Sequence, residues 1–422
     1  MIRMVLSAGF CMVLAASAVI AEETKQPFWP QFRGPNRDDH SPDVGLLKQW
    51  PKEGPPLAWK KTDLGGGGHS SVSLANGTIY TMGVQKGSSY IHALDAKDGT
   101  LRWSAKVGRD GGGTEGTSST PTVHNGLVIA LGQHSDLVCV DAAKGQELWR
   151  HNLVNEFKGT CGGWHYCESV LIDGDKLICT PGGSEATILA LGSKSGKVIW
   201  KCPIKNESAG YSSIVVSEAG GVRQYVQLLG NSLVGVRAED GKLLWRYGEQ
   251  GDRFGNNTAN IPTPIVLGDR VFAAAGYGRG GALIELSKDG DAMKAQEVYF
   301  NNQLNNKHGG VVIVGELVFA DHDDSGTPYC ADLNTGKVKW QKKKRTDGSS
   351  SAAITYADGH LYVRYANGYV ALVEADSDGY KEHGSFKIPN GDSNSWSHPV
   401  VIGGKMYLRE KDVLWCYDVK QH

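Results

Sequence analysis

The stretch Ala93 to Trp103, ALDAKDGTLRW, combines a short apolar segment, an Asp-containing turn, a Gly and a Trp four residues after that Gly. The same order of residues recurs in CVDAAKGQELW (Cys139 to Trp149), ALGSKSGKVIW (Ala190 to Trp200), GVRAEDGKLLW (Gly235 to Trp245) and CADLNTGKVKW (Cys330 to Trp340). Degenerate copies lie at 283–300 and 371–386. Self-similarity at a regular spacing is typical of a repeat architecture.

A second unit precedes each copy: a pair of small or polar residues, then two apolar segments with a turn between them, as in TPTVHNGLVIALG (Thr120 to Gly132). The second residue of each pair recurs every 43 to 51 residues, at Ser71, Pro121, Ser169, Ser213, Pro264, Gly310, Ala353 and Pro399. Each unit contains four short strands with Gly-bearing turns, which in the first unit we expect near residues 71–75, 78–83, 89–95 and 100–106. Four antiparallel strands per repeat are typical of a β-propeller blade. We therefore predict an all-β, eight-bladed propeller of four-stranded blades over residues 57–422.

The two ends of this region complement each other. The last unit stops after Cys416 to Asp418, which match the third strand of other units. Upstream of the first unit, Pro56 to Lys60 resemble the missing fourth strand and its Trp. We expect this N-terminal strand to complete the last blade and close the ring, which removes an unpaired edge. We expect the repeated Trp residues to pack between neighbouring blades: Trp59, Trp103, Trp149, Trp200, Trp245 and Trp340.

Residues 1–21 contain Arg3, an apolar run and a Val19-Ile20-Ala21 cleavage pattern. This arrangement predicts a secretory signal peptide, and hence an exported protein that is periplasmic or extracellular. Residues 22–56 then form an N-terminal extension before the propeller. No other apolar run is long enough to cross a bilayer, so we expect no transmembrane segment in the mature chain.

Charge and cysteine content narrow the function classes. With 44 Lys and Arg against 45 Asp and Glu, the chain lacks the basic excess of a nucleic-acid-binding protein. Export permits disulfides, and Cys161 and Cys167 bracket a short loop, so a disulfide between them is possible. The sequence has no CxxC pair, and its His residues lack metal-binding spacing, so we expect no metal site.

In a propeller, the loops that enter the first strand of each blade meet at one mouth of the central channel. In this sequence those loops are rich in Gly and polar groups and contain two aromatic residues outside the Trp repeat. We hypothesise that Trp164 and Trp396 offer stacking faces there, beside polar partners. The full candidate set is His69, Glu115, Trp164, His165, Tyr211, Asn257, Lys307, His308, Trp396 and His398. The alternative is that these residues only fill and solvate the channel.

The Leu-Asp-x-x-x-Gly-x-x-x-Trp repeat resembles the repeat of quinoprotein-type propellers. This superfamily contains the pyrroloquinoline quinone (PQQ)-dependent alcohol dehydrogenases and the BamB-like propellers of outer-membrane assembly. The segment WPQFRGPNRDD (Trp29 to Asp39) resembles the N-terminal stretch of exported bacterial members. The resemblance implies eight blades and a location outside the cytoplasm, but its repeated residues build blades rather than sites.

For the dehydrogenases, the resemblance implies a Ca²⁺ ion held by carboxylate and amide oxygens, an Asp or Glu base and, commonly, an adjacent Cys-Cys disulfide. This sequence has no Cys-Cys pair and no haem-attachment motif. Asn257, Glu115 and Asp252 could imitate the metal ligands, but none lies in a matching motif, so no catalytic residue is assigned. We therefore expect a scaffold that binds a protein, peptide or envelope component, with no cofactor. The alternative is a PQQ- and Ca²⁺-dependent dehydrogenase that oxidises an alcohol or polyol.

Overall fold

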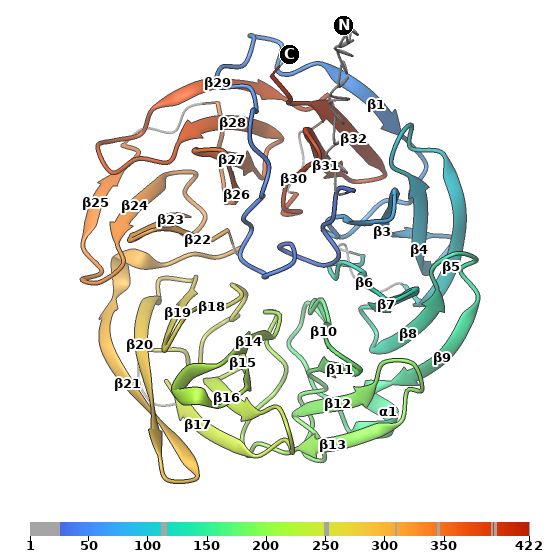
Figure 1. Cartoon of the computed structure of the whole chain (residues 1–422), viewed down its shortest axis with the longest axis vertical. Helices are drawn as coiled ribbons and strands as arrows, with labels where there is room; N and C mark the ends of the chain where they lie inside the picture. Colours follow the sequence, from blue (N-terminus) through green and yellow to red (C-terminus); the bar gives the residue numbers. More distant parts are fainter. Residues whose placement is uncertain are drawn as a thin grey trace, which may run out of the picture.

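The computed structural model describes residues 26–110, 116–248, 253–308, 310–343, 347–389, 391 and 395–421. These residues form eight four-stranded antiparallel sheets. The sheets are arranged as blades around a central channel, with the first strand of each blade innermost (Figure 1). The predicted eight-bladed propeller is therefore confirmed. The expected signal peptide, residues 1–21, lies outside the described residues.

In blades one to seven, the strands follow one another in the chain from the channel outward. Blades one and two contain β2 (Ser73–Ala75), β3 (Thr78–Gln85), β4 (Ser88–Asp95), β5 (Leu101–Arg109), β6 (Thr122–His124), β7 (Leu127–Leu131), β8 (Asp136–Asp141) and β9 (Glu147–Asn152). Blades three and four contain β10 (Leu171–Asp173), β11 (Lys176–Cys179), β12 (Ile188–Gly192), β13 (Val198–Cys202), β14 (Val215–Ser217), β15 (Gln224–Leu228), β16 (Leu233–Arg237) and β17 (Leu243–Tyr247).

The second half of the ring repeats this arrangement. Blades five and six contain β18 (Ile265–Leu267), β19 (Arg270–Ala275), β20 (Gly280–Asp289), β21 (Ala292–Asn301), β22 (Val312–Val314), β23 (Leu317–Asp321), β24 (Pro328–Asp332) and β25 (Val338–Gln341). Blades seven and eight contain β26 (Ala352–Ala357), β27 (His360–Tyr365), β28 (Tyr369–Glu374), β29 (Glu382–Lys387), β30 (Val400–Ile402), β31 (Lys405–Glu410), β32 (Val413–Asp418) and β1 (Leu57–Lys61). The connecting loops contain α1 (Leu153–Phe157), η1 (Ala219–Gly221) and η2 (Asn302–Leu304).

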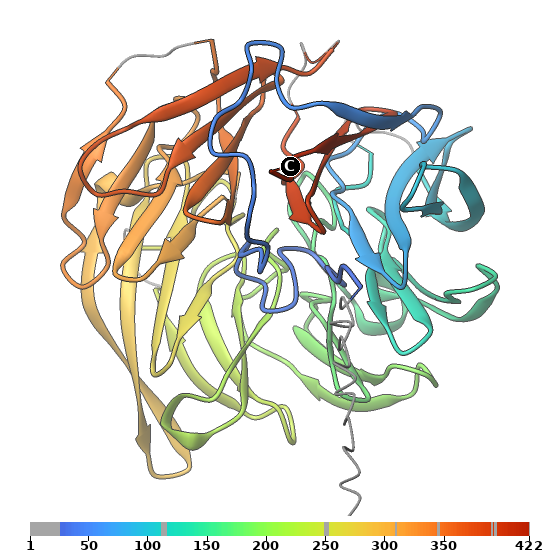
Figure 2. The ribbon, with the colours of Figure 1, turned by 45° about the horizontal axis from the view of Figure 1, so that its top comes forward.

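The outer strand of blade eight comes from the N-terminal side of the chain. Strand β1 pairs antiparallel with β32, with Trp59 opposite Cys416 and Lys61 opposite Leu414. Figure 2 shows β1 beside the C-terminal strands. The predicted closure is thus confirmed, and the last blade is complete only when two distant segments of the chain meet.

The repeated Trp residues connect neighbouring blades, as predicted. The Trp103 indole of blade one donates a hydrogen bond to the carbonyl oxygen of Ala142 in blade two, at 3.1 Å. The turn glycine of blade two lies against the same indole, so that a Cβ atom at Gly145 would meet Trp103 at 2.5 Å. Gly145 also has a φ of +68°, which favours glycine. The repeat therefore needs its Gly for two reasons, backbone conformation and close approach of the Trp.

Three blades depart from this pattern, and in blade seven Ser385 takes the place of the Trp opposite Ala371. In blade five, Tyr299 replaces the Trp and donates through its hydroxyl to the carbonyl oxygen of Leu333 in blade six, at 2.8 Å. In blade four, the Trp245 indole instead donates to the side chain of Gln224 in its own blade, at 2.6 Å. The Tyr299 contact preserves the link between blades in the degenerate repeat.

The hydrophobic core lies between the faces of adjacent sheets. For example, Ile129 and Cys139 of blade two pack in one cluster with Cys179 and Leu189 of blade three, and all four are fully buried. Among the described residues, the structure contains no disulfide bond. The Cys161–Cys167 disulfide that the sequence left possible is therefore not formed in this structure.

The N-terminal extension crosses one mouth of the channel (Figure 1). Trp29 forms a pair of backbone hydrogen bonds with Leu74 of blade one, at 2.8 and 2.7 Å, and its side chain is fully buried. The carbonyl oxygen of Asp39 accepts a hydrogen bond from the amide of Tyr356 in blade seven, at 2.9 Å. The extension thus joins blades one and seven, which flank blade eight.

Two buried arginines of the extension bind the inner strands. Arg33 donates to the carbonyl oxygen of Val311 at 2.6 Å. Arg37 donates to the carbonyl oxygens of Ser169 and Ile214, at 2.8 and 3.0 Å, and so joins blades three and four. The guanidinium group suits this place because it presents five N–H donors to strand edges that face the channel.

A buried carboxyl group lies near Arg37. Glu168 is 2% exposed and accepts hydrogen bonds from the amide and hydroxyl of Thr180, at 2.7 and 3.1 Å. Burial raises the pKa of Glu168 from 4.5 to about 8, because the Thr180 bonds and the charge of Arg37 offset the loss of hydration only in part.

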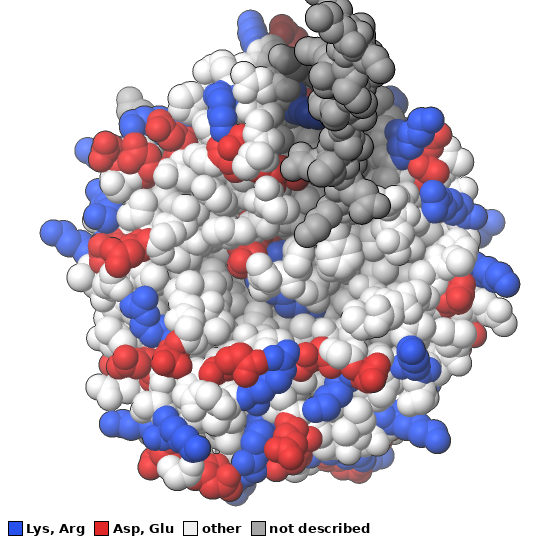
Figure 3. Space-filling view, viewed as in Figure 1, with Lys and Arg blue, Asp and Glu red and all other residues white. Residues whose placement is uncertain are grey.

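The surface around the extension carries charges of both signs. In Figure 3, Lys and Arg are interspersed with Asp and Glu around the rim of this face, and neither sign forms a continuous patch. This distribution agrees with the balanced composition. Among the described residues, no helix has the length and hydropathy required to span a bilayer.

The contact between Trp and Gly makes a prediction about stability. Gly145→Ala should lower the free energy of unfolding by about 2–4 kcal/mol, because the new methyl group both strains the backbone and displaces Trp103. Gly126→Ala is the matched control: its φ is +79°, but nothing lies within 4 Å of the added atom. It should cost about 1 kcal/mol. Equal losses in chemical denaturation of the two variants would show that the indole contact contributes nothing.

The raised pKa of Glu168 predicts a dependence of stability on pH. Between about pH 4.5 and pH 8 the folded protein holds a proton that the unfolded chain releases, so the free energy of unfolding falls as pH rises. Glu168→Gln should reduce this slope, whereas Glu239→Gln, at an exposed position, should not. Denaturation midpoints measured from pH 5 to pH 8 test this, and identical slopes in wild type and Glu168→Gln would contradict it.

Candidate functional site

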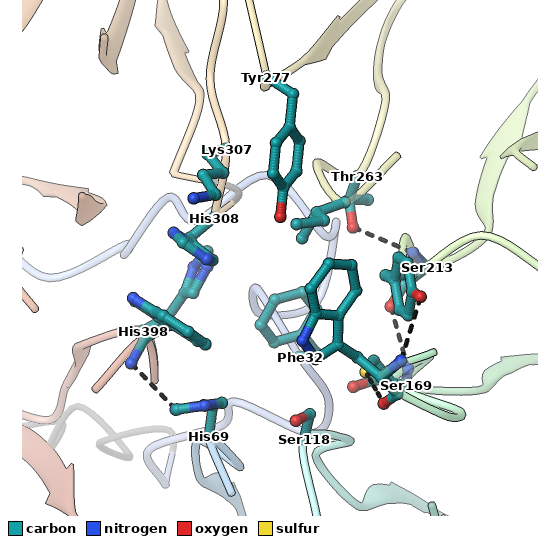
Figure 4. Close-up of a pocket in the computed structure, with 15 residues that line it drawn as sticks. Phe32, His69, Ser118, Ser169, Ser213, Thr263, Tyr277, Lys307, His308 and His398 are labelled. Atoms are coloured by element: carbon teal, nitrogen blue, oxygen red, sulfur yellow. Dashed lines mark hydrogen bonds between the residues drawn. The ribbon is translucent and has the colours of Figure 1, made fainter. Parts of the chain in front are cut away.

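A cavity of about 210 Å³ lies at the centre of the ring, where the loops before the inner strands converge. The structure brings seven of the ten candidate residues to this central pocket: His69, Trp164, Tyr211, Lys307, His308, Trp396 and His398. Figure 4 labels His69, Lys307, His308 and His398 among them. Phe32 of the extension and Tyr277, from the turn between β19 and β20, also line the pocket. These two residues are not among the candidates that the sequence suggested. Two features of the sequence could have indicated them: Phe32 is an aromatic residue of the N-terminal segment, and Tyr277 lies between two glycines in a turn.

Hydroxyl groups form a chain of hydrogen bonds from blade to blade around the pocket. The amide of Thr120 donates to the Ser169 hydroxyl at 2.8 Å, and the amide of Ser169 donates to the Ser213 hydroxyl at 3.0 Å. The amide of Ser213 donates in turn to the Thr263 hydroxyl at 3.2 Å. This chain explains why small polar residues recur before the inner strands: they join the blades and leave the pocket few hydroxyl groups for chemistry.

Trp396 lies against two imidazole rings. The ring of His308 stacks on the indole with a centroid distance of 3.9 Å and an interplanar angle of 8°. The ring of His69 lies 4.3 Å from the indole at 42°. The indole is therefore already stacked on His308, while it is still partly exposed and lines the pocket.

Both histidines are neutral near pH 7. Burial, aided by the charge of Arg364, lowers the pKa of His69 to about 4, and burial lowers that of His308 to about 3. The amide of Trp396 donates to Nδ1 of His69 at 3.3 Å, which places the His69 proton on Nε2. In His308, Nδ1 shares a short hydrogen bond with the Ser351 hydroxyl.

Lys307 and Trp164 both contact Tyr277 at the wall of the pocket. The Lys307 ammonium lies 2.6 Å from the Asp324 carboxylate and 4.6 Å above the Tyr277 ring. Burial opposes its charge, but the hydrogen bond and charge of Asp324 outweigh burial and raise the pKa of Lys307. Trp164 stacks against Tyr277 at 6.5 Å and 25°, packs edge-on against Tyr211 at 5.8 Å, and is 43% exposed. Trp164 thus provides the available aromatic surface.

His398 lies at the boundary between the pocket and the extension. Its Nδ1 is 2.9 Å from the Asp39 carboxylate, which also lies 3.3 Å from Nε of Arg33. Its ring packs edge-on against Phe32 at 4.8 Å. His398 is therefore placed to hold the extension in the channel, and it contributes little exposed surface.

Three candidates do not contribute to the central pocket. His165 lines a separate polar cavity, where its ring lies 4.7 Å from that of His134. The Asn257 amide donates to Ala259 and Asn260 at 2.9 and 3.0 Å, so it stabilises its own loop. Glu115 lies outside the described residues.

The positions of the two loop cysteines agree with the absence of a disulfide between them. Cys161 lines the cavity that contains His165, whereas Cys167 lines the central pocket. The two thiols thus border different cavities on either side of the loop that carries Trp164.

Among the described residues, the central pocket lacks the carboxylate groups that a PQQ-dependent dehydrogenase would use. Such an enzyme needs carboxylate and amide oxygens for Ca²⁺ and a carboxylate base. No Asp or Glu lines the pocket among the described residues. The nearby carboxylates of Asp324 and Asp39 are bound to Lys307 and to His398 with Arg33. The described part of the chain also holds no group of three His, Cys, Asp or Glu side chains arranged to bind a metal ion.

The sequence is similar to two groups of known proteins. The outer membrane protein assembly factor BamB of Shewanella oneidensis is 22% identical over 73% of this chain and 86% of that protein. The quinohemoprotein alcohol dehydrogenase ADH IIB of Pseudomonas putida is 31% identical, but over 32% of this chain and 20% of the enzyme. The match to BamB thus covers most of both proteins, whereas the match to the dehydrogenase covers a fifth of the enzyme.

Solved structures share the fold. BamB from Moraxella catarrhalis superposes with a TM-score of 0.60 at 14% identity, over 83% of this chain and 94% of that chain. Quinohemoprotein alcohol dehydrogenase from Comamonas testosteroni gives 0.65 at 12% identity, over 94% of this chain and 81% of that chain. Both similarities are to the architecture alone.

A family match covers more than half of the chain. The family described as outer membrane protein assembly factor BamB matches residues 55–136 and 87–342, which include the repeats quoted above. The matched region contains the closing strand β1 and most of the Trp repeats. The chain therefore belongs to the outer membrane protein assembly factor BamB family of β-propellers.

Proposed function

We propose that this chain is an exported, non-catalytic scaffold that binds a protein or peptide of the cell envelope through the loop-bearing face around the central pocket. The observation that carries this proposal is the combination of an exposed aromatic residue, Trp164, with a pocket that no described carboxylate lines. Trp residues in a concave surface are typical anchors of protein interfaces. A PQQ-dependent dehydrogenase would instead need a carboxylate base at the pocket wall.

The loop of Trp164 is held in place from both sides. The amide of Trp164 donates to the Tyr211 hydroxyl at 3.3 Å, and the thiol of Cys167 contacts the Trp164 carbonyl oxygen at 3.6 Å. A fixed aromatic side chain loses little conformational entropy when a partner binds. This favours recognition of a partner without a large rearrangement of the face.

The comparisons support a scaffold more than an enzyme. Similarity to a protein named as an outer membrane assembly factor extends over 86% of that protein, whereas similarity to a quinoprotein dehydrogenase extends over 20% of the enzyme. The expected signal peptide is consistent with a place in the envelope. We therefore expect the partner to be an envelope protein, periplasmic or associated with the outer membrane.

Site-specific photo-crosslinking tests the binding face. A benzoylphenylalanine residue at position 164 should form a distinct covalent adduct with an envelope protein in the native host. The same residue at position 44 is the control, because Val44 is 79% exposed but lies on the N-terminal extension. The same adducts at both positions, or adducts at position 44 alone, would place the partner elsewhere.

The scaffold proposal and the dehydrogenase alternative predict opposite results with PQQ and Ca²⁺, and the scaffold proposal predicts the following. Purified protein mixed with PQQ and Ca²⁺ should show no stoichiometric uptake of the quinone by visible absorbance and no dye-linked oxidation of alcohols or polyols. The reason is the lack of described oxygen ligands and of a carboxylate base at the pocket. Uptake of one quinone per chain together with turnover would replace the scaffold proposal with an enzymatic one.

A further inference from the structure

Two N–H groups of the pocket-lining side chains have no acceptor among the described residues: Nε2 of His69 and Nε1 of Trp396. Because Nδ1 of His69 accepts a hydrogen bond, Nε2 carries the proton and is a donor. A buried donor without an acceptor is unfavourable in a folded protein. These two donors therefore favour a ligand that brings an oxygen acceptor to this side of the pocket.

The other side of the pocket offers aromatic surface. Trp164 is 43% exposed and lies near the Tyr277 ring, and Phe32 also lines the cavity. Figure 4 shows Tyr277 and Phe32 directed into the same central space. Aromatic groups favour further aromatic groups in offset or edge-to-face contact. With about 210 Å³, the cavity has room for one such side chain rather than a folded segment.

The charges around the pocket favour a neutral hydrogen-bond acceptor over an anionic one. The positive charge of Lys307 is balanced by Asp324 at 2.6 Å. His69 and His308 are neutral near pH 7 because burial lowers the pKa of each. The pocket thus has no uncompensated positive charge among its described lining residues. A neutral amide carbonyl fits this environment better than a carboxylate.

We infer that the central pocket receives an aromatic side chain of the partner polypeptide, and that a neighbouring backbone carbonyl oxygen accepts hydrogen bonds from Nε2 of His69 and Nε1 of Trp396. This inference rests on the proposed function and gives it a recognition chemistry. The aromatic ring contacts Trp164 and Tyr277, and the carbonyl oxygen provides the acceptor that the two N–H groups lack.

Single-residue probes test this on the full mature chain. N-acetyl-phenylalaninamide, which has both a ring and an amide carbonyl, should bind in saturation-transfer NMR and calorimetry, whereas N-acetyl-alaninamide should not. Trp164→Ala should weaken binding about fivefold through loss of the aromatic contact. Phe28→Ala is the matched control: Phe28 is 51% exposed but does not line the pocket, so binding should be unchanged.

The hydrogen-bond donors are tested separately. His69→Phe keeps an aromatic ring but removes Nε2, and Trp396→Phe removes Nε1. Each should weaken N-acetyl-phenylalaninamide about fivefold, the usual effect of one hydrogen bond, while binding of toluene, which has no acceptor, stays unchanged. Circular dichroism of each variant checks the fold. Equal losses for toluene and the amide would contradict the role of the donors.

The free acid, N-acetyl-phenylalanine, tests the choice of a neutral acceptor. The acid should bind no more tightly than the amide. A preference for the acid of tenfold or more would overturn the inference that the acceptor is neutral. Absence of probe binding while position 164 still crosslinks to a partner would overturn the inference and leave the proposed function intact. Probe binding without any crosslinked partner would instead support the pocket chemistry and count against the scaffold.

Discussion

The ring depends on the contact between the aromatic residue of one blade and the turn glycine of the next. The Trp103 indole both donates to a carbonyl group of blade two and lies over Gly145, whose missing side chain makes the approach possible. A propeller has no single central core, because each sheet packs only against its two neighbours. The stability of the whole therefore rests on a contact repeated at blade boundaries. Tyr299, which replaces the Trp in blade five, keeps both the ring and a polar tip that reaches the next blade.

Closure of the ring creates a second constraint at the centre. The inner strands leave backbone carbonyl groups directed at the channel, and these require donors. The extension provides them through Arg33 and Arg37, which are 1% and 3% exposed and bind carbonyl groups of three different blades. Asp39 offsets the charge of Arg33 and also contacts His398. The segment Trp29 to Asp39, which resembles the N-terminal stretch of exported propellers, is thus a structural part of the channel. Its residue Phe32 lines the pocket.

The repeat allowed the architecture to be predicted in detail, because the same residues must solve the same packing problem in every blade. The number of blades, the strands of the first blade and the closing strand β1 all followed from it. The pocket was predictable in position but less so in content. His165 and Asn257 lie in the expected loops, yet a positive φ of 63° at His165 and the local hydrogen bonds of Asn257 set their side chains apart from the channel. Such local loop geometry does not repeat from blade to blade, so the sequence repeat cannot predict it.

The same repetition limits what the pocket does chemically. The hydroxyl groups that face the channel are used to join blade to blade, and the carboxylates near it are used to hold Lys307, Arg33 and His398. What is left are aromatic surface and N–H donors of neutral rings. Groups of this kind distinguish the shape and hydrogen-bonding pattern of a neutral ligand. Because the polar groups that would support catalysis are already required by the ring, a propeller with this channel is suited to recognition.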